Sequence, residues 1–148
     1  MRDFVKKYFE SCNFSEIYEV IKINEYFYYK PINKIELQNV IDLYLENREE
    51  TIKKYGIMNE WDVSNITDLS QLFKDKKDFN EDISDWEVSN VKNMFSMFFN
   101  AKKMNVNLGD WDVSNVKNMS GMFSEATDFN QSIENWNVSN VTNMNFMF

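Results

Sequence analysis

Residues 111–135 read WDVSNVKNMSGMFSEATDFNQSIEN, and the same 25-residue pattern occurs on both sides of this stretch. Counted from each tryptophan, the units are 61–85, 86–110, 111–135 and a partial fourth, 136–148. In all four, Trp, Val, Ser and Asn hold unit positions one, three, four and five, and no insertion breaks the register. A fixed period of this kind is the sequence signature of a repeat protein, in which each unit buries its apolar side against its neighbours.

The apolar positions within a unit predict its local structure. Trp86 and Val88 alternate with polar residues, a period of two that is typical of a short, half-buried strand. From Val91 onward, apolar residues recur at every third position, which favours a tight helical or 3₁₀ turn. We therefore expect the strands of successive units to pair at about 4.8 Å and to bury a continuous core.

The amino-terminal part of the chain lacks the repeat and predicts a different structure. Asn33 and Glu36 have the spacing of a helix capping box, and Gly56 predicts a helix end just before the repeats. The sequence therefore predicts a mostly helical cap over residues 1–56 and a repeat region over residues 57–148. The apolar residues that follow the capping box lie on one helical face: Leu37, Val40, Ile41 and Tyr44.

The charge and the residue inventory exclude several classes of function. Of the net charge of −8, residues 61–148 carry −6, so nucleic acid is not expected as a partner. The chain has no histidine, and Cys12 is its only cysteine, so we expect no disulfide framework, no metal site with Cys or His ligands, no cofactor and no His-dependent catalysis. The sequence has no apolar run that resembles a signal peptide or could cross a bilayer, which predicts a cytoplasmic protein without membrane insertion.

The repeat W-(D/E)-V-S-N-V-(T/K)-N-M-x-x-M-F-x-x-A-x-x-F-N-x-x-I resembles that of the BspA-like leucine-rich-repeat family. The resemblance covers residues 58–148 and is to the 25-residue branch typical of mycoplasma surface lipoproteins. Residues 37–56 are similar to leaders of family members in large DNA viruses and algae. The resemblance implies an α+β fold, a short leucine-rich-repeat-like solenoid of about 3.5 coils with an N-terminal helical cap. It also implies a role in adhesion or protein binding, and no catalytic residues.

The recurring tryptophans and asparagines have competing interpretations. A row of exposed indoles would suit a carbohydrate or cation–π platform, but Trp86 shares its side with Val88, which favours core packing with a carbonyl or Asn partner for the indole N–H. The asparagines favour a side-chain ladder between units over glycosylation, although Asn65 and Asn140 lie in Asn-x-Thr sequons. The two columns are Trp61, Trp86, Trp111 and Trp136, and Asn65, Asn90, Asn115 and Asn140.

Acidic residues flank the first three tryptophans. If each tryptophan points inward, alternation sends its neighbours outward in two rows. Like charges stacked at strand spacing repel each other, which predicts a counter-charge such as Lys or Arg of a partner, and a solvated face that keeps the protein soluble is the alternative. A calcium site is disfavoured because the Gly-Gly-x-Gly-x-Asp repeat is absent, and carboxylates repeated in every unit indicate architecture and not a glycosidase. The rows are Glu60, Asp85 and Asp110 before the tryptophans, and Asp62, Glu87 and Asp112 after them.

Differences among the units mark further candidate positions. Phe95, Phe99 and Phe146 stand where other units have polar residues. They could form a contact patch, or they could pack under the cap or against the open end of the array. Lys76 replaces the alanine found at Ala101, and we expect a looser, wetter first unit because an ammonium is not buried unpaired.

These features predict a non-enzymatic protein–protein interaction module of the leucine-rich-repeat type that binds a basic partner through an acidic strand face. Two alternatives remain open. The first is a structural or assembly component that self-associates through its open carboxy-terminal unit, at Phe148. The second is a carbohydrate-binding adhesin, which requires solvent-exposed indoles.

Overall fold

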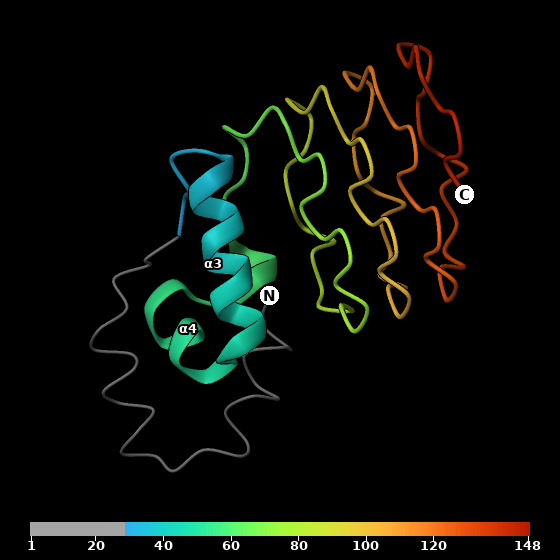
Figure 1. Cartoon of the computed structure of the whole chain (residues 1–148). Helices are drawn as coiled ribbons and strands as arrows, with labels where there is room; N and C mark the ends of the chain where they lie inside the picture. Colours follow the sequence, from blue (N-terminus) through green and yellow to red (C-terminus); the bar gives the residue numbers. More distant parts are fainter. Residues whose placement is uncertain (1–28) are drawn as a thin grey trace.

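The computed structural model describes residues 29–148, in which two helices lie at one end of a row of repeat units (Figure 1). Helix α3 spans Lys34–Glu46 and helix α4 spans Arg48–Tyr55. A 3₁₀-helix, η1, follows at Met58–Glu60 and leads into the first unit. The part of the expected cap that precedes residue 29 lies outside the described residues.

The expected α+β, leucine-rich-repeat-like solenoid of about 3.5 coils is wrong, because residues 29–148 contain no β-strand. The segment predicted to be a strand, around Trp86 and Val88, is irregular backbone followed by a turn. Between neighbouring units only isolated parallel bridges form, and they lie at unit position eight and not at the tryptophan. The bridged pairs are Asp68–Asn93, Asn93–Asn118 and Asn118–Asn143.

Alternating hydrogen bonds explain how the units join without strands. Amides at odd unit positions from nine to fifteen donate to carbonyls of the next unit, whereas those at positions twelve and fourteen donate three residues back within their own unit. The amides at these two positions therefore close turns between those that join the units, so the backbone cannot extend. In the second unit, the amides that donate forward, at 2.8–2.9 Å, belong to Met94, Ser96, Phe98 and Asn100.

The turns require left-handed backbone at two positions of each unit. Unit positions eleven and fifteen have φ between 50° and 63°. Only one of the residues there is a glycine, Gly121, so six other side chains adopt a conformation that few residues favour. The period-two apolar pattern at the tryptophan gave no sign of these reversals. The six are Gln71, Asp75, Ser96, Asn100, Glu125 and Phe146.

The predicted helix start is confirmed, with one difference in its capping. The Asn33 side chain accepts the Glu36 amide at 3.0 Å. The Glu36 carboxylate accepts the amide of Ile32 at 2.7 Å, one residue before the position that a standard capping box uses. Gly56, with φ of 74°, ends α4 as expected. The predicted apolar face is buried at Leu37, Val40, Ile41 and Tyr44.

Ion pairs hold the segment before the repeats against the first unit. Lys76, expected to leave this unit loose, is only partly exposed, and its ammonium binds Asp42 of α3. A lysine replaces the alanine of later units because this unit faces a helix and not another unit. Within the described residues, the pairs across this boundary are Lys30–Asp62, Lys34–Asp68, Asp42–Lys76 and Arg48–Glu81.

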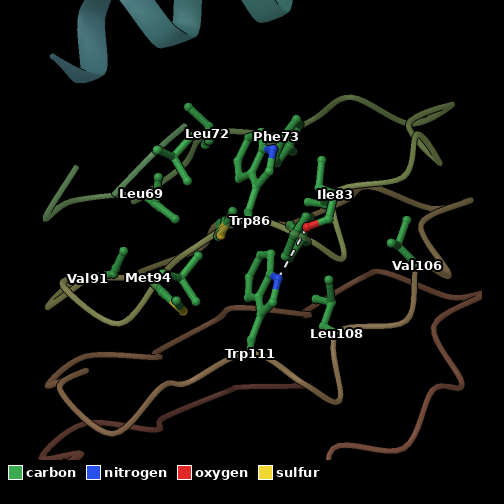
Figure 2. Close-up of a cluster of buried hydrophobic side chains, with 14 of the residues drawn as sticks. Leu69, Leu72, Phe73, Ile83, Trp86, Val91, Met94, Val106, Leu108 and Trp111 are labelled. Carbon is green, nitrogen blue, oxygen red and sulfur yellow. Dashed lines mark hydrogen bonds between the residues drawn. The ribbon is translucent and has the colours of Figure 1, made fainter. Parts of the chain in front are cut away.

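The core runs through the whole row of units as columns of equivalent side chains. The rings of Phe73 and Phe98 stack with centroids 5.4 Å apart, and Phe98 stacks on Phe123 at 5.6 Å. Figure 2 shows Trp86 and Trp111, from consecutive units, among aliphatic side chains of their neighbours. Because each unit contributes only one layer, its apolar side is covered by the units on either side.

Candidate partner-binding face

The four tryptophans are buried, with 2–8% of their surface exposed. Each indole N–H donates to a backbone carbonyl that precedes it in the chain, so the expected partner is a carbonyl and not an asparagine. The bond from Trp111 to Ile83, at 3.2 Å, is drawn in Figure 2. The tryptophan column therefore fixes the register of the units. The four indoles are buried and do not form the exposed platform that a carbohydrate site would need.

The expected asparagine ladder is present. The side-chain amides of Asn90, Asn115 and Asn140 donate to the carbonyl of the serine at position four of the preceding unit, at 2.8–2.9 Å. Asn65 makes the same bond at 2.7 Å to Pro31, which thus takes the place of a preceding unit. These bonds satisfy backbone carbonyls that no strand pairs.

A second ladder lies at unit position twenty and was missed. The side-chain oxygen of Asn80 accepts the amide of Asn105, and that of Asn105 accepts the amide of Asn130, both at 2.9 Å. The recurrence of asparagine at this position was visible in the sequence, but its direction of bonding was not. The two ladders explain why asparagine recurs at the same positions of successive units, because its side chain bonds one unit to the next.

We call the six carboxylates that flank the tryptophans the acidic face: Glu60, Asp62, Asp85, Glu87, Asp110 and Asp112. Five of them are exposed and Asp62 is partly buried. The outward direction expected for them is thus observed, although it arises from turns and the predicted strand face does not exist. The row before the tryptophans is bound at one point, where the Asn59 side chain donates to Asp85 at 2.9 Å.

The row after the tryptophans has a local role that the sequence analysis did not predict. The carboxylates of Asp62, Glu87 and Asp112 each accept the amide of the serine two residues later, at 3.0 Å. Such a bond closes an Asx-type turn, a structure that Asp forms readily with the backbone two residues on. The sequence signal for this turn is an Asp or Glu two residues before a serine. The carboxylates are therefore held in fixed positions although they are exposed.

Neighbouring groups shift the acidity of two of these carboxyls. Hydrogen bonds from the Lys30 ammonium and the Ser64 hydroxyl lower the pKa of Asp62 from 3.8 to about 2. Hydrogen bonds from the hydroxyl and then the amide of Ser114 lower the pKa of Asp112. Both groups are thus ionised at neutral pH, as a cation-binding surface requires.

Basic residues are absent from the stretches of the repeats that carry the acidic face. Residues 79–91, 104–116 and 129–141 hold seven acidic residues and no Lys or Arg. The intervening residues 92–103 hold three lysines and no acid. The equivalent residues of the third unit, 117–128, hold one lysine and two acids, so acidic and basic residues are mixed on that side of the repeats. The seven are Glu81, Asp82, Asp85, Glu87, Asp110, Asp112 and Glu134.

The three candidate aromatics lie outside the buried core, in two different units. Phe95 has 37% of its surface exposed and Phe146 has 83%. Phe99 is half-buried, and the ammonium of Lys74 lies 5.6 Å from its ring centroid. The structure therefore places Phe95 and Phe99 together in the second unit, whereas Phe146 belongs to the fourth.

Other kinds of site find little support in the part of the chain that the structure describes. No group of three or more His, Cys, Asp or Glu side chains there could hold a metal ion. Two hollows lie beside α3, one against Thr51 and Tyr55 of α4 and the other against Phe79, and neither borders the acidic face. Across residues 29–148, no helix is both long and apolar enough to cross a membrane.

Units of 25 residues, joined in register and crossed by buried Trp and Phe columns, define a repeat protein. The family model described as "Mycoplasma protein of unknown function, DUF285" matches residues 45–148, and the chain belongs to this family. The matched region begins within α3 and includes α4 and every unit. It confirms the expected relation to mycoplasma repeat proteins, whereas the similarity of residues 37–56 to viral and algal leaders stays a prediction. No curated protein and no solved structure matches the chain.

Proposed function

We propose that this chain is a non-enzymatic protein-binding module whose acidic face binds a basic segment of a partner protein. One observation carries the proposal: residues 79–91, 104–116 and 129–141 contain seven acidic residues and no basic one, while Asp85, Glu87, Asp110 and Asp112 are exposed. A surface of one sign steers a partner of the other sign and rejects partners of like charge.

The spacing of the carboxylates supports a binding role. Equivalent carboxylates of adjacent units are neighbours, because hydrogen bonds such as that from the Asn115 side chain to the Ser89 carbonyl join the units in register. Repulsion between these like charges destabilises the unbound face, and bound cationic side chains relieve it. The first unit supports this view, since its Asp62 is already paired with Lys30 at 2.8 Å.

The repetition itself supports a role without catalysis. Asp85 with Glu87 and Asp110 with Asp112 present the same pair in consecutive units. A catalytic centre is a single arrangement beside a substrate pocket, and the two hollows beside α3 do not border these pairs. A row of equivalent pairs fits recognition of an extended surface instead.

The test neutralises the exposed carboxylates without disturbing the turns. Asn137 shows that asparagine closes the same turn, since its side chain accepts the Ser139 amide at 3.2 Å. The face variant therefore combines Asp85→Asn, Glu87→Gln, Asp110→Asn and Asp112→Asn. The control variant removes four exposed charges elsewhere, by Glu46→Gln, Glu49→Gln, Glu125→Gln and Asp128→Asn.

Both variants change the net charge equally, so non-specific attraction falls equally in both. We expect Lys- and Arg-rich proteins captured from the source cells to bind the wild type and the control but not the face variant. Quantitative mass spectrometry of the captured proteins measures this. Equal capture by the two variants would contradict the proposal.

A further inference from the structure

The forward side of the fourth unit, which faces away from the third, lies at the end of the row opposite the helices (Figure 1). Phe148 stacks there on Phe123 with ring centroids 5.6 Å apart and continues the phenylalanine column. However, 70% of the surface of Phe148 is exposed, whereas its equivalent Phe123 is 2% exposed. Met144 is exposed as well, although its equivalent Met119 is fully buried. The apolar side chains that the next unit covers in earlier units are thus open to solvent in the fourth.

Backbone amides on this side have no acceptor within residues 29–148. At the three junctions between units, the amides at unit positions nine, eleven and thirteen donate to carbonyls of the next unit at 2.7–2.9 Å. The equivalent amides of the fourth unit, those of Met144, Phe146 and Phe148, form no hydrogen bond. Because the units repeat in register, these three donors face the same way as their bonded equivalents.

The same side carries free acceptors at two further positions. At the junction with the third unit, the carbonyl of Ser114 accepts the side chain of Asn140 at 2.8 Å. The carbonyl of Lys117 accepts the amide of Thr142, also at 2.8 Å. The equivalent carbonyls of the fourth unit, those of Ser139 and Thr142, accept no hydrogen bond from residues 29–148. The fourth unit thus offers donors, acceptors and an aromatic ring in the pattern that joins one unit to the next.

We propose that the forward side of the fourth unit is a docking surface for a 25-residue repeat of a second polypeptide, which adds as a further layer. The three junctions of this chain show the mode of binding, and residues 136–148 show that the first half of a unit is enough to form it. Addition of a segment to an exposed backbone edge is a general mode of recognition, in which main-chain hydrogen bonds give affinity and side chains give specificity. None of the residues that form this surface belongs to the acidic face, so the inference goes beyond the proposed function.

A second copy of this chain does not supply the docking repeat, because the complementary rear side of its first unit is covered. The side chain of Asn65 donates there to the carbonyl of Pro31 at 2.7 Å, and the amide of Asp62 donates to that of Tyr29 at 2.9 Å. Two forward sides do not pair through the backbone either, since both present amide donors at positions nine, eleven and thirteen. The partner therefore carries the repeat without such a cover.

The experiment uses the full chain, isotopically labelled for NMR, and synthetic peptides with blocked ends as probes. The first peptide has the sequence of residues 111–123, WDVSNVKNMSGMF, and carries no net charge. The second has the same sequence with Asn115→Ala, and the third has the same residues in scrambled order. We expect the first peptide to shift the amide signals of the fourth unit and to slow their hydrogen exchange. The signals are those of Met144, Phe146 and Phe148.

The control peptides test whether the peptide docks as a repeat unit does. The Asn115→Ala peptide lacks the side-chain donor to the Ser139 carbonyl. It should bind about fivefold more weakly, the usual effect of one neutral hydrogen bond. The scrambled peptide has the same composition without the register of the repeat, and it should leave the three amide signals unchanged.

Two variants of the chain locate the surface. Phe148→Ala removes the exposed ring on which the phenylalanine of the peptide stacks, and it should weaken binding of the first peptide about fivefold. Because Phe148 is largely exposed, this variant keeps its fold. The control Phe95→Ala removes a partly exposed ring of the second unit and should bind as the wild type does. The face variant should also bind this uncharged peptide normally, so the two proposals fail separately.

Three results would overturn the inference. One is the absence of shifts at the three amides when the first peptide is added, which is measured on the wild type and depends on no variant. Another is equal affinity for the first peptide and its Asn115→Ala form, or an unchanged affinity of Phe148→Ala. The third comes from sedimentation of the full chain alone, which we expect to be monomeric. Self-association that Phe148→Ala abolishes would make a second copy the occupant of this surface.

Discussion

Phe95 and Phe98 are three residues apart in the second unit, but they lie in different environments. Phe98 is fully buried and stacks between Phe73 and Phe123, whereas Phe95 has 37% of its surface exposed. Position within the unit decides this difference, because position thirteen faces the neighbouring units and position ten does not. The residue type alone does not reveal it.

Replacing Phe98 with alanine should therefore be costly. We expect Phe98→Ala to lower the free energy of unfolding by about 3–5 kcal/mol, the range for truncation of a buried phenylalanine. Phe95→Ala is the control and should cost less than about 1 kcal/mol. Urea unfolding followed by tryptophan fluorescence measures both, and similar losses in the two variants would contradict the assigned packing.

The Lys30–Asp62 pair should make stability depend on pH in the acid range. The pKa of Asp62 is lowered to about 2 in the folded chain from an ordinary value of 3.8. A lowered pKa means that the folded state binds fewer protons, so the contribution is complete above pH 3.8 and is lost as the pH falls towards 2. The effect is modest because the Asp62 side chain is 37% exposed.

Asp62→Asn should flatten the loss of stability between about pH 4 and pH 2. Lys30→Gln serves as the matched variant, because it removes the same hydrogen bond from the other side. Thermal unfolding at several pH values gives the comparison. If the wild type and both variants lose stability in parallel over this interval, the pair does not act as described.

At the scale of elements, short polar side chains decide where the helices begin. Asn33 caps α3 by accepting the Glu36 amide at 3.0 Å, and Asn47 caps α4 by accepting the Glu50 amide at 3.4 Å. Each bond satisfies one of the free amides of a helix start. Asn47 is also the single residue that separates α3 from α4.

Asn33→Ala should lower the free energy of unfolding by about 1 kcal/mol, the usual cost of a lost N-cap. Asn39→Ala, at an exposed position inside α3, is the control and should be neutral or slightly stabilising because alanine favours the helix. Chemical denaturation measures both changes. A neutral Asn33→Ala would show that another group caps the helix.

At the scale of the whole molecule, the units are interchangeable in register. Equivalent residues donate forward in each of the first three units, whose core contains the columns of Trp and Phe. Stability is then the sum of unit contributions and of the contacts between neighbours. The residues before the repeats complete only the first unit, through Lys30 ahead of α3 and through Lys34, Asp42 and Arg48 of the helices.

Deletion of one whole unit should therefore preserve the fold. Removal of residues 86–110 joins Asp85 to Trp111 and keeps every column aligned, so we expect cooperative unfolding at a lower denaturant concentration with a smaller m-value. Removal of residues 86–109 leaves one extra residue and breaks the register. Circular dichroism and urea unfolding compare the two, and equal behaviour would refute a register fixed at 25 residues.

By itself, the sequence determined the 25-residue period, the burial of the tryptophans, the asparagine ladder and the start of the helix at Asn33. These follow from repetition and from side-chain chemistry, which act over short distances along the chain. The acidic rows were likewise visible, because a charge between buried neighbours must face outward.

Only the tertiary structure decided the backbone of the units and the partners of their side chains. A period of two at Trp86 and Val88 cannot distinguish a strand from irregular backbone that is joined to its neighbours by other bonds. The left-handed residues at positions eleven and fifteen belong to turns in which the amides at positions twelve and fourteen bond within their own unit. Hydrogen bonds from the amides at the odd positions to the next unit stabilise these turns. Likewise, Lys30 meets Asp62 only because the chain before α3 takes the place of a preceding unit.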